Sequence, residues 1–181
     1  MADPGESHLV EILSVLADQH VQFIVAGGVA MVLHGVERMS LDLDIAVSLD
    51  QENLHRFLSA LRQLKLVPRA PLPAETILDR EQIQRVICEK NALVFTFWSP
   101  CEPYKQVDMF LTRENSFDDL VSGAHTLTIW GRRILVASRQ KLIEMKSRVQ
   151  PLREKDIIDI LELRRIDESL TPESGDRGSK N

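Results

Sequence analysis

Three aspartates in this 181-residue chain have a spacing that suits divalent cations. Asp42 and Asp44 are two residues apart in the alternating segment LDLDIAV, and side chains at i and i+2 of a strand point to the same face. Asp108 interrupts the apolar run QVDMFL, where a charge is unfavourable unless it is paired or binds metal. Carboxylates are ligands that Mg²⁺ prefers. The pattern predicts one or two such ions, which would activate an attacking oxygen and stabilise a leaving one.

A glycine pair precedes the aspartates. Gly27 and Gly28 follow the apolar run VQFIVA and open the segment VAMVLH, so the chain passes there from a buried strand into a short helix. Backbone N–H groups at such a turn can bind phosphate oxygens. Together with the aspartates, the pair predicts metal-dependent phosphoryl or nucleotidyl transfer, with Asp108 as third metal ligand or as general base. The alternative is that the aspartates only keep strand surfaces hydrated.

The elements that position these residues are typical of a mixed α/β domain followed by two C-terminal helices. The apolar periodicity and the capping residues Asp50 and Ser138 predict helices, here over 7–20, 29–34, 50–66, 117–122, 138–149 and 151–166. Alternation and turn residues predict strands, here over 21–26, 41–47, 92–98, 106–111, 126–130 and 133–137. The proline-containing segment 67–74 reads as a loop, and 79–90 fits either a helix or a strand. We expect a core over 1–137, a helical part over 138–166 and an unstructured tail over 167–181.

Composition narrows the class of protein. Hydrophobic residues make up 44% and charged residues 27%, as in ordinary globular proteins. A formal net charge of −5 excludes a polycation that coats nucleic acid. Cys88 and Cys101 lack metal-ligand spacing, which favours free thiols in a reducing compartment. The N-terminus does not resemble a signal peptide and no segment is apolar enough to span a membrane, so we expect a cytoplasmic protein without a membrane partner.

Two segments resemble a known family. AGGVAMVLHGVERMSLDLDIAV is similar to the first motif of the DNA polymerase β-like nucleotidyltransferase superfamily, a glycine pair followed by Asp-x-Asp. Asp108 lies where that superfamily places its third carboxylate. Arg38 and Ser40 make the motif resemble the AbiEii-type toxin nucleotidyltransferases, the toxin half of bacterial toxin–antitoxin pairs. KSRVQPLREKD is similar to the downstream Lys…Arg-x-Lys-Asp motif of that group. The resemblance covers roughly residues 20 to 165.

The resemblance implies a fold, a reaction and residue roles. The fold is α+β, with a mixed central sheet flanked by helices. The reaction is transfer of a nucleoside monophosphate from a nucleoside triphosphate to RNA, protein or a small molecule, with two Mg²⁺ ions and, for a toxin, an antitoxin partner. The implied metal ligands and catalytic residues are Asp42, Asp44 and Asp108. The implied nucleotide-binding residues are Gly27, Gly28, Arg38, Ser40, Lys146, Arg153, Lys155 and Asp156.

Several residues have alternative interpretations. Arg38 could clamp a phosphate or pair with Glu37 or Asp42, and Ser40 could bind phosphate or fix the strand start. For His34 we expect a structural hydrogen bond rather than a catalytic role. For Trp98 and Trp130 we expect packing in the core rather than stacking on a nucleobase. For the whole chain, the alternatives to a toxin-like enzyme are an antibiotic-modifying nucleotidyltransferase and a non-catalytic nucleotide-binding module.

Overall fold

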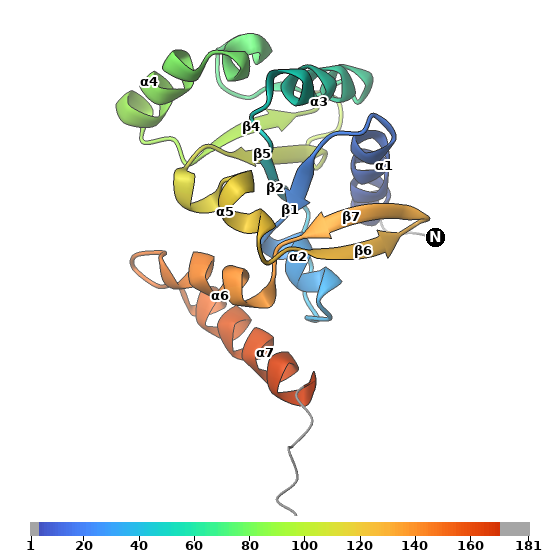
Figure 1. Ribbon diagram of the computed structural model, residues 1–181, viewed down its shortest axis with the longest axis vertical. Helices are drawn as coiled ribbons and strands as arrows, with labels where there is room; N and C mark the ends of the chain where they lie inside the picture. The colour runs from blue at the N-terminus through green and yellow to red at the C-terminus, as the bar shows by residue number, and fades with distance from the viewer. Residues whose placement is uncertain (1–3, 171–181) are drawn as a thin grey trace, which may run out of the picture.

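The computed structural model describes residues 4–170 and shows a helix-flanked sheet (Figure 1). Its α-helices are α1 (Pro4–Asp18), α2 (Gly27–Leu33), α3 (Gln51–Gln63), α4 (Arg80–Lys90), α5 (Phe117–Val121), α6 (Arg139–Ser147) and α7 (Glu154–Leu170). Its strands are β1 (Phe23–Val25), β2 (Leu43–Val47), β3 (Val67–Pro68), β4 (Val94–Trp98), β5 (Gln106–Phe110), β6 (His125–Ile129) and β7 (Arg132–Val136). Short 3₁₀ turns span Ala74–Leu78 and Arg113–Asn115.

The strands form one mixed sheet in the order β3-β4-β5-β2-β1-β7-β6. β2 pairs in parallel with β5 and antiparallel with β1, so it lies at the centre of the sheet. β1 in turn pairs in parallel with β7, which continues into the β6–β7 hairpin at one edge. This topology places the strand that carries Asp42 and Asp44 beside the strand that carries Asp108. The predicted mixed α/β fold with a central sheet is confirmed.

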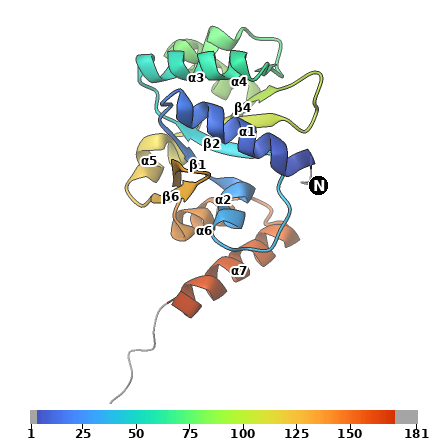
Figure 2. The same cartoon turned by 90° about the vertical axis from the view of Figure 1, so that its right-hand side faces the viewer.

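The two faces of the sheet are covered by different helices. Leu43, Ile45 and Val107 are fully buried on one face, and the Phe57 ring of α3 contacts the Phe97 ring of β4 edge-to-face on that side. Figure 2 shows α3 and α4 on one side of the sheet and α2, α6 and α7 on the other. Burial of the alternating apolar residues under α3 therefore leaves the carboxylates of β2 and β5 on the face toward α2 and α6.

The predicted helix starts at 50 and 138 are confirmed by their caps. The Asp50 carboxylate accepts from the Asn53 N–H, and the Ser138 hydroxyl accepts from the Lys141 N–H. Segment 79–90, for which the sequence allowed a helix or a strand, forms helix α4. Asp79 caps this helix by accepting from the N–H groups of residues 81 and 82. These side-chain acceptors satisfy N–H groups that have no partner within the helix.

Several boundaries differ from the prediction. Segment 67–74 is not entirely loop, since Val67 and Pro68 pair with the end of β4. The hairpin turns at Trp130–Gly131, one residue earlier than expected, because both adopt positive φ, as a tight two-residue turn requires. The last helix begins at Glu154 rather than Pro151, because the Arg153 carbonyl accepts its first helical hydrogen bond.

The predicted unstructured tail is wrong at its start. α7 continues through 167–170, since the helical hydrogen-bonding pattern does not stop at Ile166. Residues 171–181 lie outside the described part of the chain. Cys88 and Cys101 are both exposed free thiols, as expected. No helix within 4–170 is both long and apolar enough to cross a membrane.

Candidate active site

The central strands bring two of the predicted carboxylates together. In the parallel register of β2 and β5, Asp44 is the direct partner of Asp108, and Leu43 is the partner of Val107. Direct partners on neighbouring strands point to the same face of a sheet. Asp42 immediately precedes β2 and lines the same cavity as Asp44. Strand pairing therefore brings Asp44 and Asp108 side by side, although they are 64 residues apart in the sequence.

The glycine turn is in close contact with Asp44. Gly27 has φ +57°, and a Cβ at this residue would lie 1.9 Å from Asp44 Oδ2. A Cβ at Gly28 would lie 2.2 Å from the Ser40 hydroxyl oxygen. The Gly28 N–H donates to the Asp44 carboxylate. Space therefore requires both glycines, because a side chain would displace either Asp44 or Ser40, and the positive φ of Gly27 favours glycine there as well.

The surroundings of Asp44 disfavour the ionised form of its carboxyl group. Burial, together with the negative charges of Asp108 and Asp42, raises the pKa of Asp44 to about 6, against the opposing effects of the Gly28 N–H and Lys146. A buried carboxylate beside two others is stabilised by a bound cation. Within residues 4–170 none of these aspartates forms an ion pair. Asp42 and Asp44 therefore fit a divalent cation, which would supply Lewis-acid stabilisation when bound.

The surroundings of Asp108 differ from those of Asp42 and Asp44. Its carboxylate accepts from the Thr96 hydroxyl at 2.6 Å and from Gln106 Nε2 at 3.2 Å, and it does not line the cavity shared by Asp42 and Asp44. Within the described chain, no three acidic, histidine or cysteine side chains are arranged as a metal site. The role of Asp108 as third ligand or base stays a prediction, and its two hydrogen bonds fix the orientation of its carboxylate.

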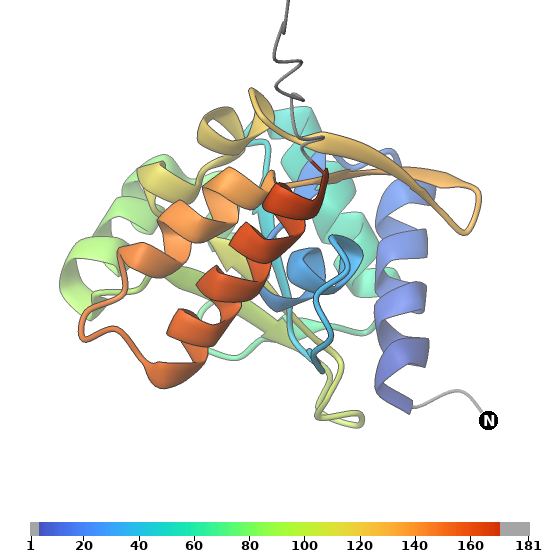
Figure 3. The same ribbon diagram turned by 90° about the horizontal axis from the view of Figure 1, so that it is seen from below.

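A network of charges from the C-terminal helices lines the same cavity as Asp42 and Asp44. On α7, Asp156 is fully buried and accepts from Arg153 Nε at 2.6 Å and from Lys146 Nζ at 3.3 Å. Asp159, one helical turn further, lies 2.6 Å from both Lys146 Nζ and Arg38 Nη1 through the same oxygen, Oδ2. α6 and α7 lie side by side there (Figure 3).

The partner of Arg38 was not foreseen. The sequence suggested Glu37 or Asp42, but the guanidinium pairs with Asp159, more than a hundred residues away. Asp159 was also missed as a site residue. Its signal in the sequence is the spacing from Asp156 within the segment DIIDIL, because residues three apart on a helix share one face. Arg38, Lys146 and Asp159 join the loop after α2 to the two C-terminal helices.

These elements enclose a cavity of about 410 Å³. Its lining includes two carboxylates, Asp42 and Asp44, and three of the cationic side chains, Arg38, Lys146 and Arg153. The cavity holds every predicted site residue except Asp108, and its predicted lining residues are Gly27, Gly28, Arg38, Ser40, Asp42, Asp44, Lys146, Arg153, Lys155 and Asp156. Carboxylates and cations that line one cavity beside a glycine turn suit a ligand that is both metal-bound and polyanionic.

Other predicted residues are structural or lie elsewhere. His34 Nε2 donates to the Ala137 carbonyl at 2.7 Å, as the structural interpretation expected. The core-packing prediction is wrong for Trp130, which is 53% exposed in the hairpin turn. Trp98 is half-buried on β4, with the Arg69 guanidinium 5.3 Å from its ring centre.

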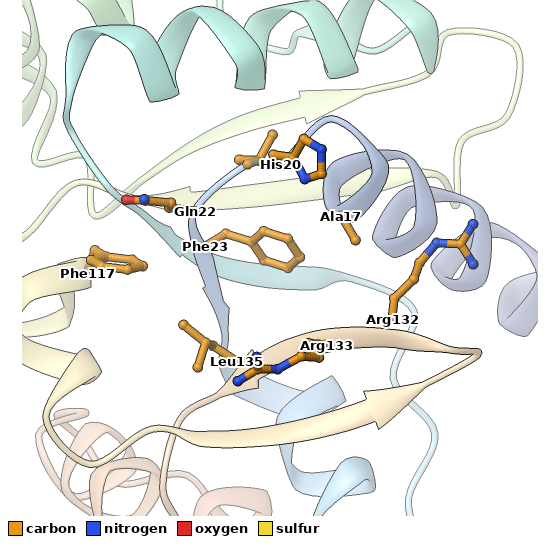
Figure 4. A pocket seen from close by; sticks show the side chains of 9 residues that line it. Ala17, His20, Gln22, Phe23, Phe117, Arg132, Arg133 and Leu135 are labelled. Atoms are coloured by element: carbon orange, nitrogen blue, oxygen red, sulfur yellow. The ribbon is translucent and has the colours of Figure 1, made fainter.

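A larger cavity of about 690 Å³ lies between α1, β1 and β7 (Figure 4). Its charged lining consists of His20, Arg132 and Arg133, and Arg132 is held by both carboxylate oxygens of Asp18 at 2.8 Å. No carboxylate lines it, so it lacks metal ligands of the kind that phosphoryl transfer requires. The smaller cavity, which two aspartates line, is therefore the candidate active site.

The fold is that of nucleotidyltransferases. The lincosamide antibiotic adenylyltransferase LnuA, solved with lincomycin, superposes with a TM-score of 0.58 at 18% identity over 89% of this chain and 97% of that one. ANT(2'')-Ia in complex with adenylyl-2''-tobramycin gives 0.57 at 16% identity over 91% and 88%. A nucleotidyltransferase-like protein of Paracoccidioides brasiliensis gives 0.52 at 15% identity over 90% and 77%.

No protein-family model matches the chain, and no curated protein matches it significantly. The structural likeness thus confirms the expected nucleotidyltransferase fold. The resemblance to AbiEii-type toxins stays a prediction.

We expect divalent-cation binding to weaken as the pH falls through about 6, the value to which burial and neighbouring charges raise the pKa of Asp44. A proton and a metal ion compete for the same carboxylate, so protonation below the pKa lowers the apparent affinity for the metal. Titration with Mn²⁺, monitored by its electron paramagnetic resonance signal, measures the affinity between pH 5 and 8. An affinity that stays constant across pH 6 would contradict a metal site at Asp44.

Proposed function

We propose that the chain is a nucleotidyltransferase that moves a nucleoside monophosphate from a nucleoside triphosphate to an acceptor. The observation that carries the proposal is the cavity that the Gly27–Gly28 turn, Asp42 and Asp44 line together with Arg38, Lys146 and Arg153. The carboxylates suit metal ions that bridge phosphate oxygens. The cations suit the remaining negative charge of a triphosphate. The fold shared with nucleotidyltransferases supports the same reaction.

In this reaction the acceptor oxygen forms a bond to the α-phosphorus, and the bond between that phosphorus and the bridging oxygen of the β-phosphate breaks. Pyrophosphate leaves with the bonding electrons, and the proton of the acceptor hydroxyl must be taken up. Asp108, oriented by Thr96 and Gln106, is the candidate base. Lys146 and Arg38, which line the same cavity, would balance charge on the leaving pyrophosphate.

The sequence resemblance and the similar structures favour different classes of acceptor. The similarity of GGVA…RMSLDLD to AbiEii-type motifs favours RNA or protein and, with it, an antitoxin partner. The structures of LnuA with lincomycin and of ANT(2'')-Ia with adenylyl-2''-tobramycin favour a small hydroxylated antibiotic. Both readings use the same phosphate chemistry, so the acceptor must be determined by experiment.

The test uses nucleoside triphosphates labelled at the α-phosphorus or, in parallel, at the γ-phosphorus. The full chain is incubated with Mg²⁺ and each of four acceptors: tRNA, a protein extract, an aminoglycoside and a lincosamide. Transfer of the α-label with release of pyrophosphate supports the proposal, and the labelled acceptor identifies the substrate class. Transfer of the γ-label alone would mean a kinase. Tight nucleotide binding without pyrophosphate release would favour a non-catalytic binding module.

A further inference from the structure

The outer face of α7 exposes an apolar stripe. Ile157, Ile158 and Leu161 are 44%, 55% and 58% exposed, although isoleucine and leucine are usually buried. They lie at i, i+1 and i+4, which places them together on one side of the helix. The opposite side, with Asp156, Asp159 and Ile160, is buried against the rest of the chain. A helix with apolar residues on both sides indicates a second packing partner.

Charged residues extend the stripe at both ends. Glu154 precedes the apolar centre by one turn, and Arg164 and Arg165 follow it by one turn on the same side. The outer stripe therefore has an acidic end, an apolar centre and a basic end. Arg165 forms an exposed ion pair with Glu162 of its own helix, and the charge of Glu37 also acts on it. Within residues 4–170, Arg164 has no hydrogen bond or ion pair. Both guanidinium groups are thus available to an external carboxylate.

We propose that this stripe binds the same stripe of a second copy of the chain, with the two α7 helices antiparallel about a two-fold axis. When Ile158 of one copy packs on Leu161 of the other, Glu154 comes opposite Arg165. The two-fold axis repeats that pair, so the interface holds two Glu–Arg pairs around an apolar centre. A parallel arrangement would instead place Glu154 on Glu154 and align the helix dipoles unfavourably. The charge order therefore selects the antiparallel dimer.

The parts of the chain outside the described residues do not fit the stripe. Residues 171–181 read TPESGDRGSKN and residues 1–3 read MAD, so neither offers a row of large apolar side chains. The pocket-lining Lys155 and Asp159 lie on a different side of α7 from Leu161, so the dimer leaves the candidate active site accessible. One helix pair is smaller than a standard interface, and we expect association in the micromolar range.

The test is sedimentation velocity of the full chain over a concentration series, without nucleotide or acceptor, so that its result does not depend on the proposed activity. The wild type should shift from the mass of one chain to that of two. Leu161→Lys should remain a single chain throughout. Leu93→Lys is the matched control, because Leu93 is 67% exposed on the loop that enters β4. It should dimerise as the wild type does. Circular dichroism confirms that both variants fold.

Charge reversal tests the orientation. Glu154→Arg alone should stay monomeric, because Arg then faces Arg, and Arg164→Glu/Arg165→Glu should stay monomeric for the mirrored reason. An equal mixture of the two should form a heterodimer with affinity near that of the wild-type dimer. A wild type that is monomeric at every concentration overturns the proposal, and some other molecule then covers the stripe. A dimer that survives Leu161→Lys, or a mixture that stays monomeric, also overturns it.

Discussion

Replacing Asp44 with asparagine should lower nucleotidyl transfer about a thousandfold, which corresponds to ~4 kcal/mol of transition-state stabilisation. The carboxylate lies between the Gly27–Gly28 turn and Asp108, where a metal ion would contact both protein and phosphate. Asparagine keeps the shape of the side chain and can still accept from the Gly28 N–H. The loss should therefore appear in kcat with α-labelled nucleotide, while the fold is preserved.

The same substitution should make the metal-free protein more stable at neutral pH. The pKa of Asp44 rises from 3.8 to about 6 on folding, because burial and the charges of Asp108 and Asp42 oppose ionisation. The folded state thus holds its proton more tightly, and the free energy of unfolding falls as the pH rises from 3.8 to about 6. Removing this charge should recover on the order of 3 kcal/mol above pH 6.

Thermal melts at pH 4 and pH 7 in a chelator, for wild type and Asp44→Asn, measure this effect. Asp118→Asn is the control, because Asp118 is an exposed aspartate on α5. Greater stability of Asp44→Asn at pH 7 but not at pH 4 is the expected pattern. A variant that is less stable than wild type at both pH values would show that Asp44 is a structural carboxylate, and its loss of activity would then say nothing about metal.

The sequence predicts the part of the site that is local. Asp42, Asp44 and the glycine pair lie within 18 residues, so strand periodicity and one turn are enough to place them together. Parallel pairing of β2 with β5 could not be derived from either segment, because it depends on the strand order of the whole sheet. Asp108 was nevertheless identifiable, since a carboxylate in the apolar run QVDMFL conflicts with its local pattern.

The part that the sequence could not predict is the long-range ion pairing. The Arg38–Asp159 contact joins a loop to a helix that follows it by more than a hundred residues, and both ends have nearer partners of opposite charge. Local rules favour those nearer partners. Packing of α7 against α6 and the loop decides the outcome, because it buries Asp156 and Asp159 and so requires cations beside them. Tertiary burial, and not sequence proximity, selects the pairs.

Replacing Asp156 with asparagine should destabilise the protein by roughly 3 kcal/mol, because it leaves cations without their buried counter-charge. Burial opposes the charge of Asp156, but hydrogen bonds and charges from Arg153 and Lys146 outweigh it, and the pKa is lowered. Ionised Asp156 therefore stabilises the fold above its unfolded pKa of 3.8, and this stability is lost as the pH falls through the lower folded value. Urea unfolding at pH 7 measures the change.

Asp18→Asn is the matched control, because Asp18 also forms a bidentate pair with an arginine but is 60% exposed at its side chain. Solvent screens that pair, and its loss should change the unfolding midpoint far less. Equal effects of the two substitutions would contradict the buried network.

Nucleotide should partly rescue Asp156→Asn if the network is part of a triphosphate site. Asp156 and Asp159 both neutralise Lys146, and a bound triphosphate would bring negative charge to the same cation. The difference in Tm between wild type and Asp156→Asn should therefore shrink when a nucleoside triphosphate is added with Ca²⁺, which binds carboxylates and phosphates. The Asp18→Asn difference should not change. A deficit that is the same with and without nucleotide would place the Lys146–Asp156 pair outside the phosphate site, and would limit Lys146 to holding α6 on α7.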